Sequence, residues 1–226
     1  MTTKAKMKML IDVVMTLLLF AVMAYPMTGE ALHKALGICL FLFFILHHIL
    51  NLKWYQSVTK GRYTAVRITY LCLNSLLLLC MIGLMVSGFL LSSLAYDLHI
   101  YEGMFGRKLH MLTASWGYIL MSAHIGLHWG MFAGMIRKKI KVKAPRILAY
   151  LFCGFAVLYG LYEAFARQFF LKMFWLLDYA FYDFNEPAVL FVIDYLFIMV
   201  AFASLAYYAI KLSRKRTAKK KESKAP

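Results

Sequence analysis

Six apolar runs, each about twenty residues long and therefore long enough to cross a bilayer as a helix, occupy nearly the whole of this chain. Hydrophobic residues make up 63% of the sequence and charged residues only 16%. A soluble domain could not bury that much apolar surface. The sequence therefore predicts an all-α integral membrane protein, a bundle of six transmembrane helices over residues 9–27, 31–52, 68–93, 108–134, 147–167 and 187–211.

The placement of basic residues predicts the orientation of these helices. Of the 26 Lys and Arg residues, 21 fall at the N-terminus, in the second and fourth connections and in the C-terminal tail. Positively charged loops remain in the cytoplasm, so both termini are expected there. Residues 1–212 then form the membrane domain and residues 213–226 a basic cytoplasmic tail. The net charge of +16 is explained by this topology and by attraction to anionic membrane lipid, and we expect no nucleic-acid partner.

Two pairs of histidines lie within the apolar runs, His33 with His47 and His110 with His124. Both spacings are fourteen residues, almost four helical turns, which puts each pair on one helix face about 21 Å apart along the axis. The second and fourth helices run in the same direction in the predicted topology. We therefore expect His33 to face His110 near the outer surface and His47 to face His124 nearer the cytoplasm.

Four imidazoles so arranged could hold two stacked hemes. Ionisable residues inside a membrane are rare and functional by default, and two histidines on each iron favour electron transfer because no coordination position stays open. The four cysteines form no CxxCH sequence, so the hemes are expected to be non-covalent, b-type hemes. Two neighbours leave the ligand assignment open, because His48 adjoins His47 and His128 lies one turn beyond His124.

Three further residues are candidates for contact with the hemes. Arg107 precedes His110 by one turn and Arg67 opens the third helix, so each is expected either to pair with heme propionates at its own depth or to anchor a helix end. Gly117 lies midway between the two histidines of its helix, where a side chain would meet the edges of the macrocycles. Polar residues expected to form hydrogen bonds between helices are Asn74, Ser87 and Ser122.

An aromatic-rich segment, residues 168–187, separates the fifth and sixth helices and predicts an interfacial helix or a re-entrant loop. A second interpretation makes it one wall of a quinol pocket or a docking surface for a redox partner. Glu163, Asp183 or Asp194 would then accept protons. Pairing of Asp194 with Arg167 is the other explanation for a carboxylate within the sixth helix.

Four strings of the sequence together resemble the bacterial flavinylation-associated membrane cytochromes, a family long catalogued as a domain of unknown function. In order, these strings are MTGEALHKALG, HHILNLKWYQSVTKGRY, RKLHMLTASWGYILMSAHIGLHW and FYDFNEPAVLFVIDYLFIM. The resemblance covers nearly the whole chain. It implies a di-heme b-type cytochrome of the bacterial cytoplasmic (inner) membrane, which passes electrons to extracytoplasmic proteins carrying covalently attached FMN. The histidine pattern is also similar to that of cytochrome b and of ferric-reductase-like membrane domains.

The sequence contains no glycine-rich phosphate loop after a strand, so the chain is expected to exchange electrons with separate molecules. The quinol pool is the expected donor and an external FMN protein the expected acceptor, although flow in the reverse direction is equally compatible with the sequence. The chain would then be an electron-transfer subunit of a membrane oxidoreductase, with quinol dehydrogenase as one activity to consider. The alternative is a non-redox transporter or assembly factor whose histidines handle a metal ion or protons.

Overall fold

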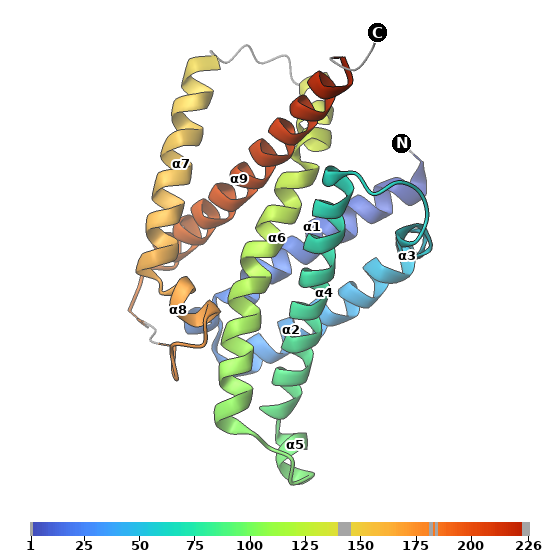
Figure 1. Cartoon of the computed structure of the whole chain (residues 1–226). Helices are drawn as coiled ribbons and strands as arrows, with labels where there is room; N and C mark the ends of the chain where they lie inside the picture. The colour runs from blue at the N-terminus through green and yellow to red at the C-terminus, as the bar shows by residue number, and fades with distance from the viewer. Residues whose placement is uncertain (1, 140–145, 181–182, 184, 223–226) are drawn as a thin grey trace. The chain divides into compact units, whose positions relative to one another are not determined.

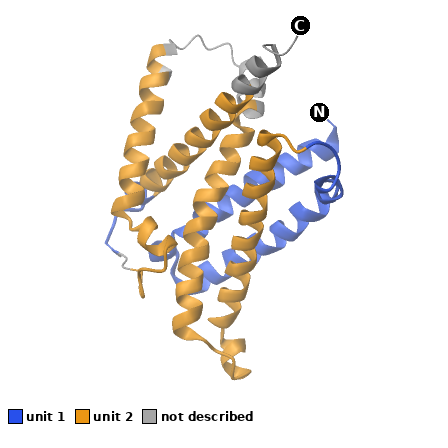
Figure 2. Ribbon diagram, in the orientation of Figure 1, with its two compact units in different colours: residues 1–62, 181–191 blue, residues 63–180, 192–226 orange. Residues whose placement is uncertain are grey.

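The computed structural model describes residues 2–139, 146–180, 183 and 185–222, and these residues form helices and turns without a strand. The chain divides into two compact units, which Figure 2 shows in different colours. Unit 1 comprises residues 1–62 and 181–191, and unit 2 comprises residues 63–180 and 192–226.

Each of the six predicted segments corresponds to a helix in Figure 1, so the prediction of an all-α chain is confirmed for the described residues. These helices are α1 (Thr3–Met23), α2 (Tyr25–Leu50), α4 (Ala65–Leu90), α6 (Gly103–Lys139), α7 (Arg146–Ala166) and α9 (Ala188–Glu222). Short helices lie in the connections: α3 (Leu52–Val58), α5 (Ser93–Asp97) and α8 (Phe169–Met173). The last helix continues beyond residue 212, where the basic tail was predicted to begin.

Within the described residues, three helical segments are long and apolar enough to cross a membrane, namely Tyr25–Leu50, Ala65–Leu90 and Ala188–Arg214. A shorter apolar segment covers Tyr150–Ala166. Large apolar side chains are widely exposed, for example Leu17 at 65% and Leu79 at 62%, which is typical of a surface that contacts lipid. The chain therefore has the apolar helices of a membrane protein.

Unit 1 is built around a hairpin of α1 and α2. The chain turns at Ala24, and Pro26 stands in the first turn of α2. Gly29 then kinks the helix, with φ of 69° and ψ of 176°, a backbone conformation that is nearly restricted to glycine. At the other end of the hairpin Lys8 Nζ donates to Asn51 Oδ1 at 2.7 Å. Because the start of α1 contacts the end of α2, the two helices run antiparallel.

In unit 2, α4 and α6 form a second antiparallel pair. The hydroxyl of Tyr70, near the start of α4, donates to the carbonyl oxygen of Leu127 in the second half of α6 at 2.9 Å. Gly83 of α4 and Thr113 of α6 meet where a Cβ on the glycine would lie 2.5 Å from the threonine methyl. The two helices therefore approach each other closely along most of α4.

The helix α9 lies along α6 and runs in the same direction. The hydroxyl of Tyr118 in α6 donates to the carbonyl oxygen of Tyr195 in α9 at 2.8 Å. Eight residues further along both helices, a Cβ on Gly126 would lie only 2.0 Å from the carbonyl oxygen of Ala203. The close approach of α6 and α9 therefore depends on glycine at this position.

The helix α7 packs on α9 in the opposite direction. Tyr159, toward the end of α7, donates its hydroxyl hydrogen to Asp194 Oδ1 near the start of α9 at 2.6 Å. Nearer the start of α7, Cys153 Sγ lies 3.7 Å from Ser204 Oγ. These contacts bring the N-terminal half of α7 beside the middle of α9.

The connection between α7 and α9 is held against the N-terminal half of α6. Trp116 Nε1 of α6 donates to the carbonyl oxygen of Met173 in α8 at 2.9 Å. Lys108, at the start of α6, forms an ion pair with Asp178. The described part of the predicted aromatic segment therefore contains α8 and is attached to α6 at more than one point.

Candidate functional site

The two histidines of α2 both bond through Nδ1 to oxygens of α1. His33 Nδ1 lies 3.0 Å from the carbonyl oxygen of Val22, in the last turn of α1. The residue four positions after Val22 is Pro26, which has no N–H to donate to that carbonyl. His47 Nδ1 lies 2.8 Å from Asp12 Oδ1. Both imidazoles are thus oriented by the preceding helix.

The two histidines of α6 are held in the same way by α4. His124 Nδ1 lies 2.9 Å from Asn74 Oδ1, and His110 Nδ1 lies 3.0 Å from Ser87 Oγ. The Ser87 hydroxyl also lies 3.1 Å from the carbonyl oxygen of Leu84, to which it can donate its single hydrogen while its oxygen accepts from His110. Interhelical hydrogen bonding was predicted for Asn74 and Ser87 and is confirmed.

These contacts define the tautomer of three imidazoles. A backbone carbonyl, a carboxylate and an amide oxygen can only accept, so Nδ1 of His33, His47 and His124 carries the proton. Nδ1 of His110 carries it when the Ser87 hydroxyl donates to Leu84. Nε2 then carries the lone pair, and a metal would bind through Nε2. Each hairpin therefore contains a first helix that supplies acceptors and a second helix that presents two oriented imidazoles.

The two alternative ligands have different surroundings. His48 Nδ1 lies 2.6 Å from the hydroxyl of Tyr55, which is in the adjoining helix α3, and the His48 ring packs against Phe44. The ring of His128 packs against Tyr70 and His124, with centroids 5.6 and 4.8 Å away. In His33 and His47, by contrast, Nδ1 contacts an oxygen of the antiparallel helix α1. In His110 and His124, Nδ1 contacts an oxygen of the antiparallel helix α4.

The two arginines predicted to contact the hemes, Arg67 and Arg107, lie beside tyrosines. The guanidinium of Arg67 lies over the ring of Tyr63 at 4.8 Å, and that of Arg107 lies over the ring of Tyr179 at 4.9 Å. Gly117 faces α4, as the histidines of α6 do, and a Cβ there would lie 3.7 Å from Cys80 Cβ. Helix packing alone therefore tolerates a methyl group at Gly117.

Glu163, Arg167 and Asp194 form a polar cluster where α7 ends and α9 begins. Arg167 Nη2 lies 2.5 Å from Asp194 Oδ2, and Arg167 Nε lies 3.6 Å from Glu163 Oε2. Asp194 is buried and also accepts from Tyr159. The pairing of Asp194 with Arg167, one of the two explanations derived from the sequence, is thus what the structure contains. The side chain of Asp183 has a backbone contact, accepting from the Asn185 N–H at 2.8 Å.

Asp12 and Tyr159 are the residues of these clusters that the sequence reasoning missed. Asp12 could have been found, because a carboxylate within an apolar run is unusual in a membrane helix. Tyr159 gave no such signal, because tyrosine is common in this chain. The prediction for Ser122 was wrong, since its hydroxyl donates to the carbonyl oxygen of Tyr118 in its own helix.

Comparison with known proteins identifies no relative of this chain. No family model matches the chain, and no curated protein or solved structure gives a significant match. Across the described residues, no group of three or more His, Cys, Asp and Glu side chains gathers in a way that could hold a metal ion.

Proposed function

We propose that this chain is a di-heme b-type membrane cytochrome that relays electrons across the membrane, from quinol to an extracytoplasmic protein carrying FMN. The observation that carries the proposal is that each of four Nδ1 atoms lies within hydrogen-bond distance of an oxygen of the neighbouring helix. Histidines that bind metals almost always donate their second ring nitrogen in this way, because the bond fixes the ring and raises its basicity. Its presence in both hairpins supports a ligand role for the whole set.

Neutral imidazole is a common ligand of heme iron, so these residues fit the cofactor. We pair His33 with His110 and His47 with His124, as their predicted depths require. When bound, heme would supply a one-electron ferric–ferrous couple. The chain holds Nε2 of His33, His47 and His124 deprotonated, because Nδ1 of each carries the proton. In this proposal Arg67 and Arg107 neutralise propionates and Gly117 leaves room for a macrocycle, roles that the sequence positions favour.

The proposed topology has six spans with both termini in the cytoplasm. Helices α1 and α6 are more polar than the three most apolar spans, but their polar groups contact partner helices. Asp12 of α1 bonds to His47, and His124 of α6 bonds to Asn74. Polar residues that face a neighbouring helix are compatible with a membrane-spanning segment. This supports counting α1 and α6 among the spans.

The first test is the heme content of the purified protein. Protein expressed with added heme and purified in mild detergent is expected to contain about two hemes per chain, with the spectrum of non-covalent b-type heme. A folded protein without heme would contradict the proposal and favour metal or proton handling by the histidines.

Single substitutions of the histidines test the ligand assignment. Alanine at His33, His47, His110 or His124 is expected to remove one heme and leave the other. His99 is the matched control, because it lies in the connection before α6 and outside the long helices. Loss of a heme in His48→Ala with retention in His47→Ala would overturn the choice between those two, and His128 is compared with His124 in the same way.

A further inference from the structure

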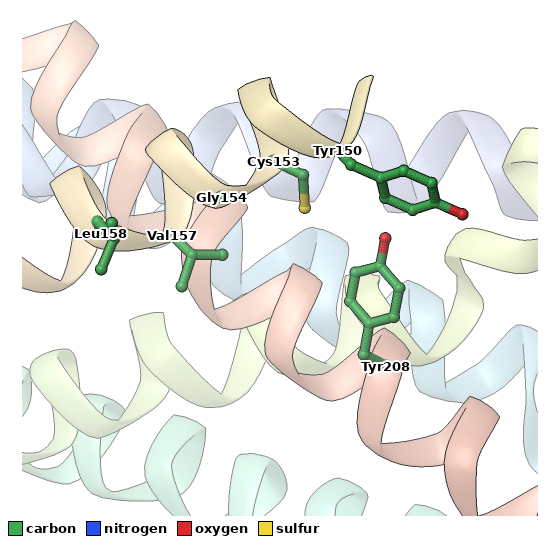
Figure 3. Close-up of a pocket in the computed structure, with 6 residues that line it drawn as sticks. All are labelled: Tyr150, Cys153, Gly154, Val157, Leu158 and Tyr208. Carbon is green, nitrogen blue, oxygen red and sulfur yellow. The ribbon is translucent and has the colours of Figure 1, made fainter. Parts of the chain in front are cut away.

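A groove of about 390 Å³ lies between α7 and α9. Figure 3 shows its lining, which is formed by Tyr150, Cys153, Gly154, Val157, Leu158 and Tyr208. A Cβ added to Gly154 would meet nothing within 4 Å, so the missing side chain of this glycine helps to open the groove. The volume is in the range of sites that bind small molecules.

The groove opens onto an apolar surface. Leu151 and Leu158 of α7 are 65% and 71% exposed, and Leu212 of α9 is 57% exposed. In a membrane these side chains contact lipid tails, so a ligand would enter the groove from the hydrocarbon phase. The surroundings select a ligand that is itself soluble in lipid.

Polar atoms gather at one end of this apolar groove. In Figure 3 the hydroxyl of Tyr208 points toward α7, where Tyr150 and Cys153 lie. Three tyrosines elsewhere in the fold donate their hydroxyl hydrogens to an oxygen of a neighbouring helix: Tyr70 of α4, Tyr118 of α6 and Tyr159 of α7. The hydroxyl of Tyr208 instead shares a hydrogen bond with the thiol of Cys153 across the groove. A thiol is a weak hydrogen-bonding partner, so the oxygen of a ligand can replace it.

We infer that this groove binds the ring of a lipid-soluble quinol or quinone, an inference that rests on the proposed function and names the site of its electron donor. A quinol ring has two oxygens that donate hydrogen bonds, and the oxidised ring has two that accept them. A tyrosine hydroxyl can act in either sense, so Tyr150 and Tyr208 suit both forms. The apolar tail of the ligand would follow the exposed leucines of α7 into the lipid.

The register of α6 and α9 places the groove near one particular histidine. A Cβ on Gly130 would lie 3.9 Å from Tyr207 Cε2, so the level of Tyr207 on α9 matches that of Gly130 on α6. His124 precedes Gly130 by six residues, or about 9 Å along the helix. The groove therefore lies toward the His124 end of α6 and far from His110.

Photoaffinity labelling with an azido-quinone tests this inference directly. The heme-loaded protein in detergent is irradiated with the probe, and the labelled residues are located by fragmenting the labelled peptides in the mass spectrometer. We expect label at or next to Tyr150 and Tyr208, and competition by unmodified quinone. Tyr150→Phe with Tyr208→Phe is expected to weaken quinone binding by about tenfold, since two hydrogen bonds are lost. Tyr162→Phe, on an exposed side chain of α7 outside the groove, is the control.

A steric variant gives an independent measurement. Gly154→Leu adds a side chain to the groove at a position where its Cβ meets nothing within 4 Å, and it is expected to abolish labelling while the heme content stays unchanged. Gly88→Leu is the matched control, because its Cβ also meets nothing within 4 Å. Labelling that persists in Gly154→Leu, or that fragmentation of the labelled peptides places on Glu163 or Asp194, overturns the groove but leaves the cytochrome proposal intact. Absence of heme from the wild-type protein contradicts the cytochrome proposal whatever the labelling result.

Discussion

Asp12 distinguishes His47 from the other three proposed ligands. Its carboxylate accepts the Nδ1 proton of His47 at 2.8 Å, whereas the acceptors for His33, His110 and His124 are neutral. A carboxylate partner increases the basicity of an imidazole more than a neutral oxygen does, and a more basic ligand stabilises ferric iron. The heme proposed to bind His47 is therefore expected to have a lower midpoint potential than the other heme.

Asp12→Asn is expected to raise the midpoint potential of one heme by on the order of 50 mV while two hemes remain bound. The reason is the loss of negative charge beside His47 with the hydrogen-bond acceptor retained. A potentiometric titration followed by heme absorbance measures the shift. An equal shift of both hemes would contradict the assignment of Asp12 to a single site.

Asn74→Asp is the reciprocal change. It places a carboxylate beside His124, which we propose binds the same iron as His47. This substitution is expected to lower the midpoint potential of the heme whose potential Asp12→Asn raises. If the two substitutions act on different hemes, His47 and His124 do not share an iron and the pairing is wrong.

The sequence indicated the histidines but not what orients them. A spacing of fourteen residues is visible in one helix, whereas the contact of His33 with Val22 depends on the turn at Ala24 and on the missing N–H of Pro26. A backbone carbonyl carries no side-chain signal, so no residue pattern could have identified that acceptor. Asp12 did carry a signal, since it is an isolated acid in an apolar run.

At the scale of helices, the contact of α6 with α9 depends on Gly126. Gly126→Ala is expected to destabilise the protein by about 2 kcal/mol and lower the melting temperature by roughly 5 °C, because the methyl group would lie 2.0 Å from the carbonyl oxygen of Ala203. Thermal unfolding in detergent measures the effect. Gly130→Ala is the control, because its methyl group would meet Tyr207 at an ordinary contact distance. Equal melting temperatures for the two variants would show that α6 and α9 do not approach so closely.

Lys172 of α8 gives a pH-dependent prediction for the connection between α7 and α9. Burial, reinforced by the nearby Arg167 guanidinium, lowers the pKa of its amine to about 8, and Nζ donates to the carbonyl oxygen of Arg167 at 3.0 Å. Acylation followed by mass spectrometry is expected to show half-maximal reactivity of Lys172 near pH 8. The folded chain holds this proton less tightly than the unfolded chain, so this residue adds stability as pH rises from about 8 toward 10.5. A midpoint near 10.5 would contradict its burial.

Helix positions were predictable because apolar length is a property of local sequence. The predicted segments 31–52 and 147–167 differ by only a few residues from the regular part of α2 and from α7. The ends of α6 and α9 were less predictable, because both helices continue into basic segments where no apolar pattern marks an end. The kink at Gly29 was also missed, since glycine within a helical pattern is often tolerated without a break.

For the whole molecule, the six-span topology makes one decisive prediction about α6. If α6 crosses the membrane, the residues before and after it lie on opposite sides. In a cysteine-free background, Tyr96→Cys before α6 should react with an impermeant maleimide added outside intact cells, and Ile147→Cys after α6 should react only after permeabilisation. Both positions are exposed, at 70% and 74%, so access does not limit either reaction. Gln56→Cys, in α3, is the cytoplasmic reference.

The polarity of α6 comes from histidines bonded to α4 and from small polar residues, which a partner helix shields from lipid. Labelling of Ile147→Cys from the same side as Tyr96→Cys would mean that α6 does not cross, and His110 and His124 would then lose the depth relation on which two hemes depend.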